Sequence, residues 1–350
     1  MIKVGIIGFS HGHAYSVCGE WLQHSEELNV LPTVYWEPDD GKAKEVNEKL
    51  PQLTRVSTLE ELLSGDIQAV LITCETAYHA DMVEKAAAAG KDIICYKPLA
   101  LTMAQADRIV EAVNKHHVRF SMGWQMRTDP QNKRMREICR GGELGKVCLF
   151  RRRHGLGTHT WVGFEDTWHN NPALNRDIFA DDSSHPINLM QWIFGMPETV
   201  SCEMSTMVNP KVPNDNGVAL FRYADGMIAE ITVSFTTSAA DPTTEIYLSG
   251  GAVVQRYGDG PGTKLPKSGE GLRWYKEGDG DWTDSGIESP ANQGVRLAAQ
   301  AKPLAAFLNG GEPVCTAEEG RDTLRLVLSC YLSSREGRRV SVYDPRVYDI

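Results

Sequence analysis

The first third of the chain alternates short apolar runs with amphipathic stretches. Apolar runs that break at turn residues predict buried strands, which we place at 2–8, 30–36, 68–73, 91–95 and 118–123. Apolar residues at helical spacing, with capping signals and helix-ending glycines, predict helices around 14–22, after 57–60, over 79–89 and over 102–116. This alternation predicts an α/β fold of the Rossmann type, a doubly wound parallel sheet, over residues 1–123.

The remaining residues, 124–350, follow a different pattern. β-forming residues alternate or cluster around Gly and Asp turns, which predicts an α+β domain with a large, mostly antiparallel sheet, built from 146–155, 199–208, 217–235, 244–258 and 272–278. Residues 223–226 are expected to turn a hairpin. We expect helices near 130–140 and 187–194, two more in about the last sixty residues, and surface loops over 258–286.

The composition narrows the kind of partner. The chain has 350 residues and a formal net charge of −10, so no basic excess is present to neutralise phosphates, and nucleic acid is not an expected partner. The eight cysteines form no Cys-x-x-Cys pair, which favours free thiols in a reducing compartment. The first residues lack the features of a signal peptide, and no apolar run approaches the roughly 18 residues of a spanning helix. We therefore expect a cytoplasmic protein with no membrane partner.

Candidate binding residues gather at the ends of the predicted parallel strands. Gly8, Glu37, Thr73 and Lys97 all follow or end such strands, and in doubly wound sheets ligands bind beyond this edge. The turn GFSHGHAY opens a helix, and its Gly8 fits the first glycine of a dinucleotide fingerprint, although a plain helix-capping turn is the alternative. Lys97 by itself is compatible with a loop residue before a proline and with a catalytic group.

Glu37 bears on which dinucleotide fits. An acidic residue at the end of the second strand can accept hydrogen bonds from the ribose hydroxyls, and it repels a 2′-phosphate. NAD is therefore favoured over NADP, with a solvated turn carboxylate as the alternative interpretation of Glu37.

Two segments carry candidate chemistry in the second domain. Asp181 and His185 are four residues apart, and Pro186 restricts the following helix to a start near 183–184, with Asp181 just ahead of it. A helix cap and a catalytic pair fit this segment equally well.

Histidine and tryptophan are frequent in residues 154–169, but no tight ligand spacing occurs there, so no metal is expected. Two interpretations of this segment remain open: its residues line a polyol pocket, or they form a surface loop.

Taken together, these motifs resemble the glucose–fructose oxidoreductase / inositol 2-dehydrogenase family (Gfo/Idh/MocA) over nearly the whole chain. TAYHADMVEKAAAAGKDIICYKPLALT resembles the family block that ends in Glu-Lys-Pro, with Tyr96 in place of the glutamate. DDSSH matches the family's Asp-x-x-x-His motif, and MGWQMRTDP, GGELGKV and NDNGVALFRYADG resemble further family segments in the same order. Ser10 and His13 replace fingerprint glycines, and Pro186 follows the motif histidine.

The resemblance implies a role for particular residues. Lys97 corresponds to the active-site lysine that holds the substrate hydroxyl, and Asp181 and His185 correspond to the acidic and histidine members, with histidine as the proton acceptor. The cofactor-binding residues implied are Gly8, Phe9, Ser10, His11, Gly12, His13, Glu37, Thr73, Cys74, His79, Tyr96, Lys97 and Arg127. The substrate-binding residues implied are Lys97, Gln125, His154, Trp168, His169, Asp181 and His185.

The expected activity follows from this resemblance. It is an NAD-dependent oxidoreductase that moves a hydride between the nicotinamide and a hydroxyl carbon of a sugar, cyclitol or related polyol. Histidine suits removal of the hydroxyl proton, and a cationic lysine suits an oxygen that gains alkoxide character. Two alternatives remain open: a glycosidase or lyase that works by transient oxidation with no net NADH, and a non-catalytic sugar or dinucleotide sensor. Residues 1–123 would bind the cofactor and 124–350 the substrate, in a homodimer or homotetramer.

Overall fold

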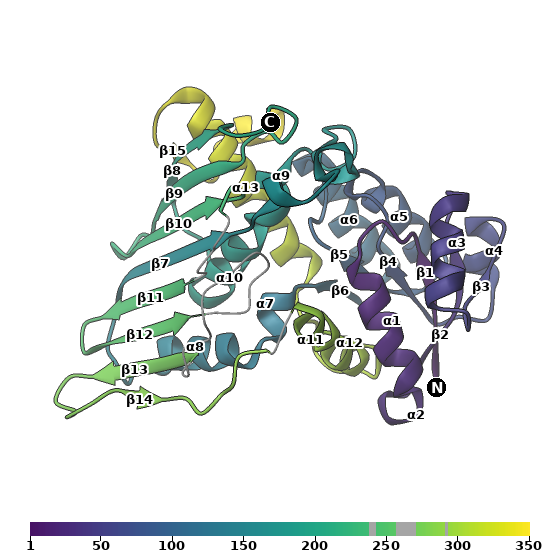
Figure 1. Ribbon diagram of the computed structural model, residues 1–350, viewed down its shortest axis with the longest axis horizontal. Helices are drawn as coiled ribbons and strands as arrows, with labels where there is room; N and C mark the ends of the chain where they lie inside the picture. Colours follow the sequence, from purple (N-terminus) through teal and green to yellow (C-terminus); the bar gives the residue numbers. More distant parts are fainter. Residues whose placement is uncertain (238–242, 257–270, 291–292) are drawn as a thin grey trace. The chain divides into compact units, whose positions relative to one another are not determined.

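We describe a computed structural model of the chain, which covers residues 1–237, 243–256, 271–290 and 293–350. Residue contacts divide it into two compact units (Figure 1). The first unit comprises Met1–Thr128, Ala173–Asn175 and Gly294–Leu324, and the second comprises Asp129–Pro172, Arg176–Gln293 and Arg325–Ile350. The segments 173–175 and 294–324 thus pack with the first unit, although the sequence pattern grouped them with 124–350. The division of labour between the two domains stays a prediction.

The first unit is built on a six-stranded sheet in the order β3-β2-β1-β4-β5-β6, and every strand pair is parallel. The strands are β1 (Ile2–Ile7), β2 (Val30–Trp36), β3 (Thr54–Arg55), β4 (Ala69–Ile72), β5 (Asp92–Tyr96) and β6 (Phe120–Gly123). From β1 the chain adds strands first on one side (β2, β3) and then on the other (β4, β5, β6). This change of side between β1 and β4 confirms the predicted doubly wound sheet.

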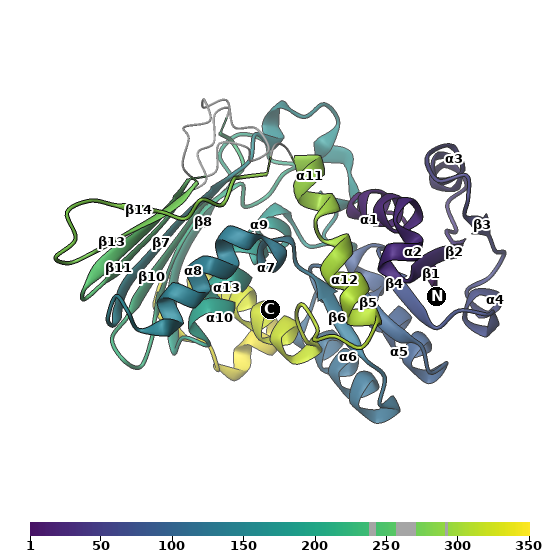
Figure 2. The same ribbon diagram turned by 90° about the horizontal axis from the view of Figure 1, so that it is seen from below.

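Helices cover both faces of this sheet. Figure 2 shows α1 and α12 on one side and α5 and α6 on the other. The helices of the unit are α1 (His13–Gln23), α2 (Ser25–Leu28), α3 (Asp40–Lys49), α4 (Leu59–Ser64), α5 (His79–Ala88), α6 (Met103–His116), α7 (Gln125–Thr128), α11 (Gln293–Ala298) and α12 (Ala301–Leu308). A 3₁₀ turn, η1 (Thr76–Tyr78), precedes α5.

The late segment joins the first unit because α12 packs onto α1. Leu304 and Phe307 are buried in one apolar cluster with Val17 and Trp21 of α1. The indole N–H of Trp21 also donates to the carbonyl of Ala301 at 2.8 Å, so the buried polar atom has a partner. Burial of these large side chains explains why residues near α12 pack with the first unit although they come late in the sequence.

Two helix starts follow the predicted capping chemistry, one of them shifted by a residue. Thr102 accepts from the backbone N–H of Gln105, as predicted for α6. For α4 the sequence placed the capping box at 57–60, but Thr58 is the N-cap, and its hydroxyl accepts from the N–H of Glu61 at 3.0 Å. The prediction was wrong by one residue, because Glu61 rather than Glu60 reaches back, to the N–H of Ser57.

The second unit holds a nine-stranded sheet in the order β14-β13-β12-β11-β7-β10-β9-β8-β15. Among the described strands of this second sheet, only β7 and β10 pair in parallel, which confirms the predicted mostly antiparallel sheet. The strands are β7 (Val147–Gly155), β8 (Thr199–Ser205), β9 (Asn216–Arg222), β10 (Ile228–Ser234), β11 (Thr243–Leu248), β12 (Gly251–Arg256), β13 (Leu272–Lys276), β14 (Thr283–Asp284) and β15 (Val340–Ser341). The β9–β10 hairpin turns at the predicted residues 223–226.

Helices α8 and α10 lie along one face of this second sheet (Figure 2). The elements outside the sheet are α8 (Pro130–Gly141), α9 (Ile178–Asp182), α10 (Ser184–Phe194), α13 (Ala317–Glu336), η2 (Thr158–Thr160), η3 (Phe164–Asp166), η4 (Trp168–Asn170) and η5 (Pro345–Asp349). Helix α13 begins within the first unit and ends in the second. No helix among the described residues is both long and apolar enough to cross a membrane.

The structure corrects three expectations about elements. Three α-helices follow residue 292 instead of two, because α11 and α12 are separate. The loop stretch 258–286 contains β13 and β14, while its residues 258–270 lie outside the described part of the chain. Helix α10 starts at Ser184, as predicted, but Asp181 ahead of it lies inside a short helix, α9, that was not predicted.

Candidate functional site

The Gly-rich turn after β1 lies directly against the end of β4. Gly8 has a positive φ of 77°, and a Cβ built on it would stand 2.6 Å from Cβ of Cys74. The backbone N–H of His11 donates to the carbonyl of Thr73 at 2.9 Å. Burial raises the pKa of the Cys74 thiol, so this side chain acts as a neutral packing surface. Only glycine fits at position 8, which is the requirement of a turn that brings backbone close to a dinucleotide.

Glu37 is bound to this turn by its own carboxylate. It is 3% exposed, and its two oxygens accept from the N–H groups of Phe9 at 2.8 Å and Asp39 at 3.0 Å. The Arg55 guanidinium donates to the backbone carbonyl of Glu37 rather than to the carboxylate, at 2.7 and 3.2 Å. A negative charge is therefore fixed at the end of β2.

A second charged group, which the sequence analysis missed, lies beside the turn. The ammonium of Lys42 donates to the hydroxyl of Ser10 at 2.6 Å and to the carboxylate of Glu75 at 2.8 Å. Burial alone would raise the pKa of the Glu75 carboxyl, but hydrogen bonds from Lys42 and Ser10 outweigh it and lower that pKa. Ser10, which replaces a fingerprint glycine, is thus part of a polar cluster on the surface of the turn.

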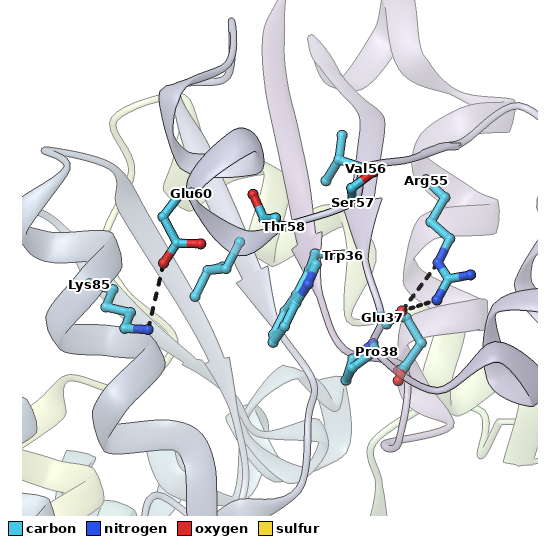
Figure 3. Close-up of a pocket in the computed structure, with 10 residues that line it drawn as sticks. Trp36, Glu37, Pro38, Arg55, Val56, Ser57, Thr58, Glu60 and Lys85 are labelled. Carbon is cyan, nitrogen blue, oxygen red and sulfur yellow. Dashed lines mark hydrogen bonds and ion pairs between the residues drawn. The ribbon is translucent and has the colours of Figure 1, made fainter.

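These groups line two neighbouring pockets on the first unit. One, of about 290 Å³, is bordered by Gly8, Glu37, Lys42 and Glu75. The other, of about 590 Å³, shares Trp36, Glu37 and Pro38 with the first and continues to Arg55, Thr58 and Lys85. In Figure 3 the Trp36 side chain stands between the Glu60–Lys85 pair and Arg55. The close turn, the fixed acidic residue and the adjoining pockets at one strand edge fit a bound dinucleotide.

His79 holds the loop that carries Lys97. It is buried, with Nδ1 2.9 Å from the carbonyl oxygen of Pro98 and Nε2 3.1 Å from that of Cys74. Burial lowers the pKa of His79, against the opposing effect of these carbonyls and that of Leu99. The side chain therefore ties β4 to the loop after β5. Lys97 is itself only 4% exposed, and its bond to Pro98 is cis.

The remaining predicted residues of the first unit lie in different surroundings. Tyr96 is fully buried, with its ring centroid 5.2 Å from that of His11 and 5.4 Å from that of His13, and burial raises its pKa.

Arg127 forms an ion pair with Glu319 at 2.6 Å within the same unit, and Gln125 is buried. Gly12 caps α1 without a side chain, and Phe9 packs its ring against aromatic neighbours.

Two of the predicted residues of the second unit, His154 and His185, lie beside a carboxylate that was not predicted. Oδ2 of Asp182 lies 2.7 Å from Nε2 of His154, and its Oδ1 lies 3.9 Å from Nε2 of His185. The sequence analysis paired His185 with Asp181 because of the motif spacing. Asp181 is buried in α9 and its backbone carbonyl accepts from the Ser184 hydroxyl at 2.5 Å. The i,i+3 spacing of Asp182 and His185 was the available signal.

Trp168 and His169, two further predicted residues of this unit, contact each other. Trp168 and His169 stack on each other, with ring centroids 4.1 Å apart, and Nδ1 of His169 lies 3.2 Å from the Thr167 hydroxyl. No group of three or more His, Cys, Asp or Glu side chains in the described ranges is arranged to hold a metal ion. All eight cysteines are free.

The fold and the turn define the class: a protein with a dinucleotide-binding sheet and a separate α+β unit. The model of an "Oxidoreductase family, NAD-binding Rossmann fold" matches residues 2–124, and that of the "GFO/IDH/MocA C-terminal domain" matches residues 132–254. Together these matches cover well over half of the chain. The protein therefore belongs to the Gfo/Idh/MocA family of oxidoreductases, as the motifs indicated.

Individual relatives are distant. An uncharacterized oxidoreductase of Bacillus subtilis is 29% identical over 47% of this chain and 48% of its own, so the chain spans about half of that relative. The D-apiose dehydrogenase of Paraburkholderia graminis is 26% identical over 80% of this chain and 74% of its own, and the myo-inositol 2-dehydrogenase of Thermotoga maritima is 25% identical over 66% and 67%. A levoglucosan dehydrogenase structure with NADH and L-sorbose has a TM-score of 0.80 at 19% identity, covering 97% of this chain and 98% of that one. This likeness shows the shared fold.

Replacement of His79 tests its structural role. Because the pKa of His79 is lowered in the folded state, the unfolded state binds more protons once the pH falls below about 6.5, and stability falls with it. We expect His79→Gln to reduce the free energy of unfolding by about 1–3 kcal/mol at neutral pH and to make its decline towards pH about 5.5 shallower. Urea unfolding at several pH values measures both.

His116→Gln, at an exposed position on α6, is the matched control and should leave the pH dependence unchanged. A His79→Gln curve parallel to that of the wild type would show that His79 is not held neutral by burial.

Proposed function

We propose that this protein is an NAD-dependent dehydrogenase that oxidises a hydroxyl carbon of a sugar, cyclitol or related polyol. The observation that carries the proposal is Lys97, a lysine buried to 4% exposure at the strand edge that also holds the Gly8 turn. Lysine side chains are mostly exposed to solvent, so a lysine buried at a ligand-binding edge favours a role in the reaction. The named activities of the relatives, on myo-inositol and D-apiose, support the substrate class.

The roles of the side chains follow from their chemistry. NAD, when bound, accepts the hydride from the carbinol carbon. Lys97 donates a hydrogen bond to the substrate hydroxyl and stabilises negative charge as the proton leaves. His185 takes that proton, because a neutral imidazole is a base suited to neutral pH. Asp181, four residues before His185 and buried in α9, is the acidic residue of the motif.

Removal of the two groups gives a direct test. We expect Lys97→Ala and His185→Asn each to lower kcat by roughly 10²–10⁴-fold, because positioned charge and general base catalysis are worth factors of this size. Absorbance of NADH, with NAD and a panel of sugars, cyclitols and glycosides, measures the rates, and chromatography follows each sugar.

Lys115→Ala, at an exposed position near the end of α6, is the matched control. Unchanged kcat in Lys97→Ala would contradict the assignment. An altered sugar without net NADH would support transient oxidation instead, and binding of NAD with no turnover of any sugar would support a sensor.

The proposed preference for NAD over NADP rests on the charges around β2. The Glu37 carboxylate is held in place by two backbone N–H groups, so it cannot turn away from a 2′-phosphate without losing both bonds. The cations that line the two pockets are already engaged, Lys42 with Glu75 and Arg55 with Asp40, each at 2.8 Å, and Lys85 with Glu60 at 3.9 Å. A phosphate there would meet a fixed negative charge with no uncommitted positive one.

Glu37→Gln tests this preference. The amide keeps the size of the side chain and removes the charge, so we expect the ratio of kcat/KM for NAD to that for NADP to fall at least tenfold. Glu48→Gln, on the exposed side of α3, should leave the ratio unchanged. A ratio that stays constant in Glu37→Gln would show that other groups select the cofactor.

We also propose a homodimer or homotetramer that associates through the strand face opposite α8 and α10. Val218 and Leu220 on β9 and Ile228 on the neighbouring β10 are 41%, 45% and 39% exposed, and Tyr247 on β11, which lies beyond β7, is 42% exposed. Together they form a patch of exposed apolar side chains that is interrupted by the ion pairs of Arg151 with Glu230 and Glu245. Such a patch is unusual on a monomer and common at protein interfaces.

Leu220→Asp places a charge in this patch, and we expect it to shift the molar mass measured by light scattering towards the monomer. Val162→Asp changes an equally apolar but fully exposed loop residue and serves as the control. A Leu220→Asp protein that keeps the mass of the wild type would place the interface elsewhere.

A further inference from the structure

The carboxylate of Asp182 is held between two histidines by rigid parts of the second unit. His154 lies near the end of β7, which is an interior strand bordered by β10 and β11. Asp182 ends α9, and His185 lies in the first turn of α10. Regular elements on both sides therefore fix these side chains more firmly than loops would.

The start of α9 is anchored independently. Asp177 caps the helix by accepting from the N–H of Ala180 at 3.0 Å, and it also accepts from the side-chain amide of Asn214 at 2.7 Å and from the Tyr331 hydroxyl. Burial raises the pKa of this carboxyl against those hydrogen bonds. A five-residue helix with a buried, triply bonded N-cap leaves little freedom for the position of Asp182 at its other end.

The short bond between Asp182 and His154 determines the tautomer of the imidazole. A carboxylate only accepts hydrogen bonds, so Nε2 of His154, 2.7 Å away, must carry the proton. In the neutral ring Nδ1 is then bare and can only accept. Nδ1 is buried and has no hydrogen-bond partner among the described residues, and the side chain is 10% exposed. An acceptor buried in this way is costly unless a donor from a ligand or water satisfies it.

We propose that Asp182 is a positioning residue which holds His154 as a hydrogen-bond acceptor for a second hydroxyl of the substrate, and so selects neutral polyols over sugar acids. The ring centroids of His154 and His185 are 6.4 Å apart, a separation that two hydroxyls of one polyol can bridge. A hydroxyl donates to the bare Nδ1, whereas a carboxylate oxygen offers no proton and would also face the negative charge of Asp182. The inference rests on the proposed function, since His185 is the proton acceptor there.

Asp182→Asn removes the requirement that Nε2 of His154 carry the proton. The amide nitrogen can donate to Nε2, which a carboxylate cannot do, so the proton of the imidazole is able to move to Nδ1, where His154 offers a donor instead of an acceptor. We expect at least a tenfold fall in kcat/KM for the best neutral polyol and a smaller gap between that polyol and the sugar acids D-gluconate and D-glucuronate. His154→Phe should remove the same discrimination, and Asp182→Asn in that background should add no further loss.

The tautomer is measured without any substrate. Nitrogen-15 NMR of the histidine rings at alkaline pH separates a bare from a protonated nitrogen, and we expect a bare Nδ1 for His154 in the wild type and a protonated Nδ1 in Asp182→Asn. Asp166→Asn, whose exposed carboxylate pairs with Lys211, is the matched control. Thermal unfolding checks that each variant is folded.

The two proposals fail separately. Failure of every polyol to yield NADH would overturn the proposed function, while the NMR spectra would still test Asp182. Oxidation of a polyol by a wild-type protein whose His154 carries its proton on Nδ1, or equal losses for polyols and sugar acids in Asp182→Asn, would overturn the inference alone. Multiplicative losses from Asp182→Asn and His154→Phe would likewise show that Asp182 does not act through His154.

Discussion

The contact between the Gly8 turn and the end of β4 is the constraint on which the first unit depends. Parallel pairing brings the carboxyl ends of β1, β2, β4 and β5 to one edge, and the missing Cβ of Gly8 allows the turn to approach Cys74 there. Glu37 then reaches the N–H of Phe9, and His79 joins the chain after β4 to the loop after β5. Each group that we assign to the cofactor is placed by this convergence.

Charge is used differently in the two units. In the first, the Glu37 carboxylate is held by two backbone N–H groups, and the neighbouring ammonium of Lys42 is neutralised by Glu75. In the second, one carboxylate faces two imidazoles, so a change at Asp182 acts on both rings. We propose that the first arrangement favours a cofactor without an added phosphate, and that the second favours a substrate whose hydroxyls donate hydrogen bonds.

The sequence was a good guide where the signal is local. The strands of the first sheet are short apolar runs that end at turn residues, and β2 and the end of α6 were placed correctly. Helix α3 was missed because it is mostly polar and buries only Ala43 and Val46. The site was harder, since the pairs Lys42–Glu75 and His154–Asp182 join residues 33 and 28 positions apart. A motif spacing led to Asp181, whereas the fold brings Asp182 to His154.

The most direct test of the central claim, that a hydride moves from a polyol carbon to the nicotinamide, is isotopic. The wild-type protein is incubated with NAD and with a substrate polyol deuterated at the oxidised carbon, and the cofactor is analysed by mass spectrometry. The account predicts one deuterium on the reduced nicotinamide for each molecule of carbonyl product. A reduced cofactor without deuterium, or a product formed while the cofactor acquires none, would contradict it.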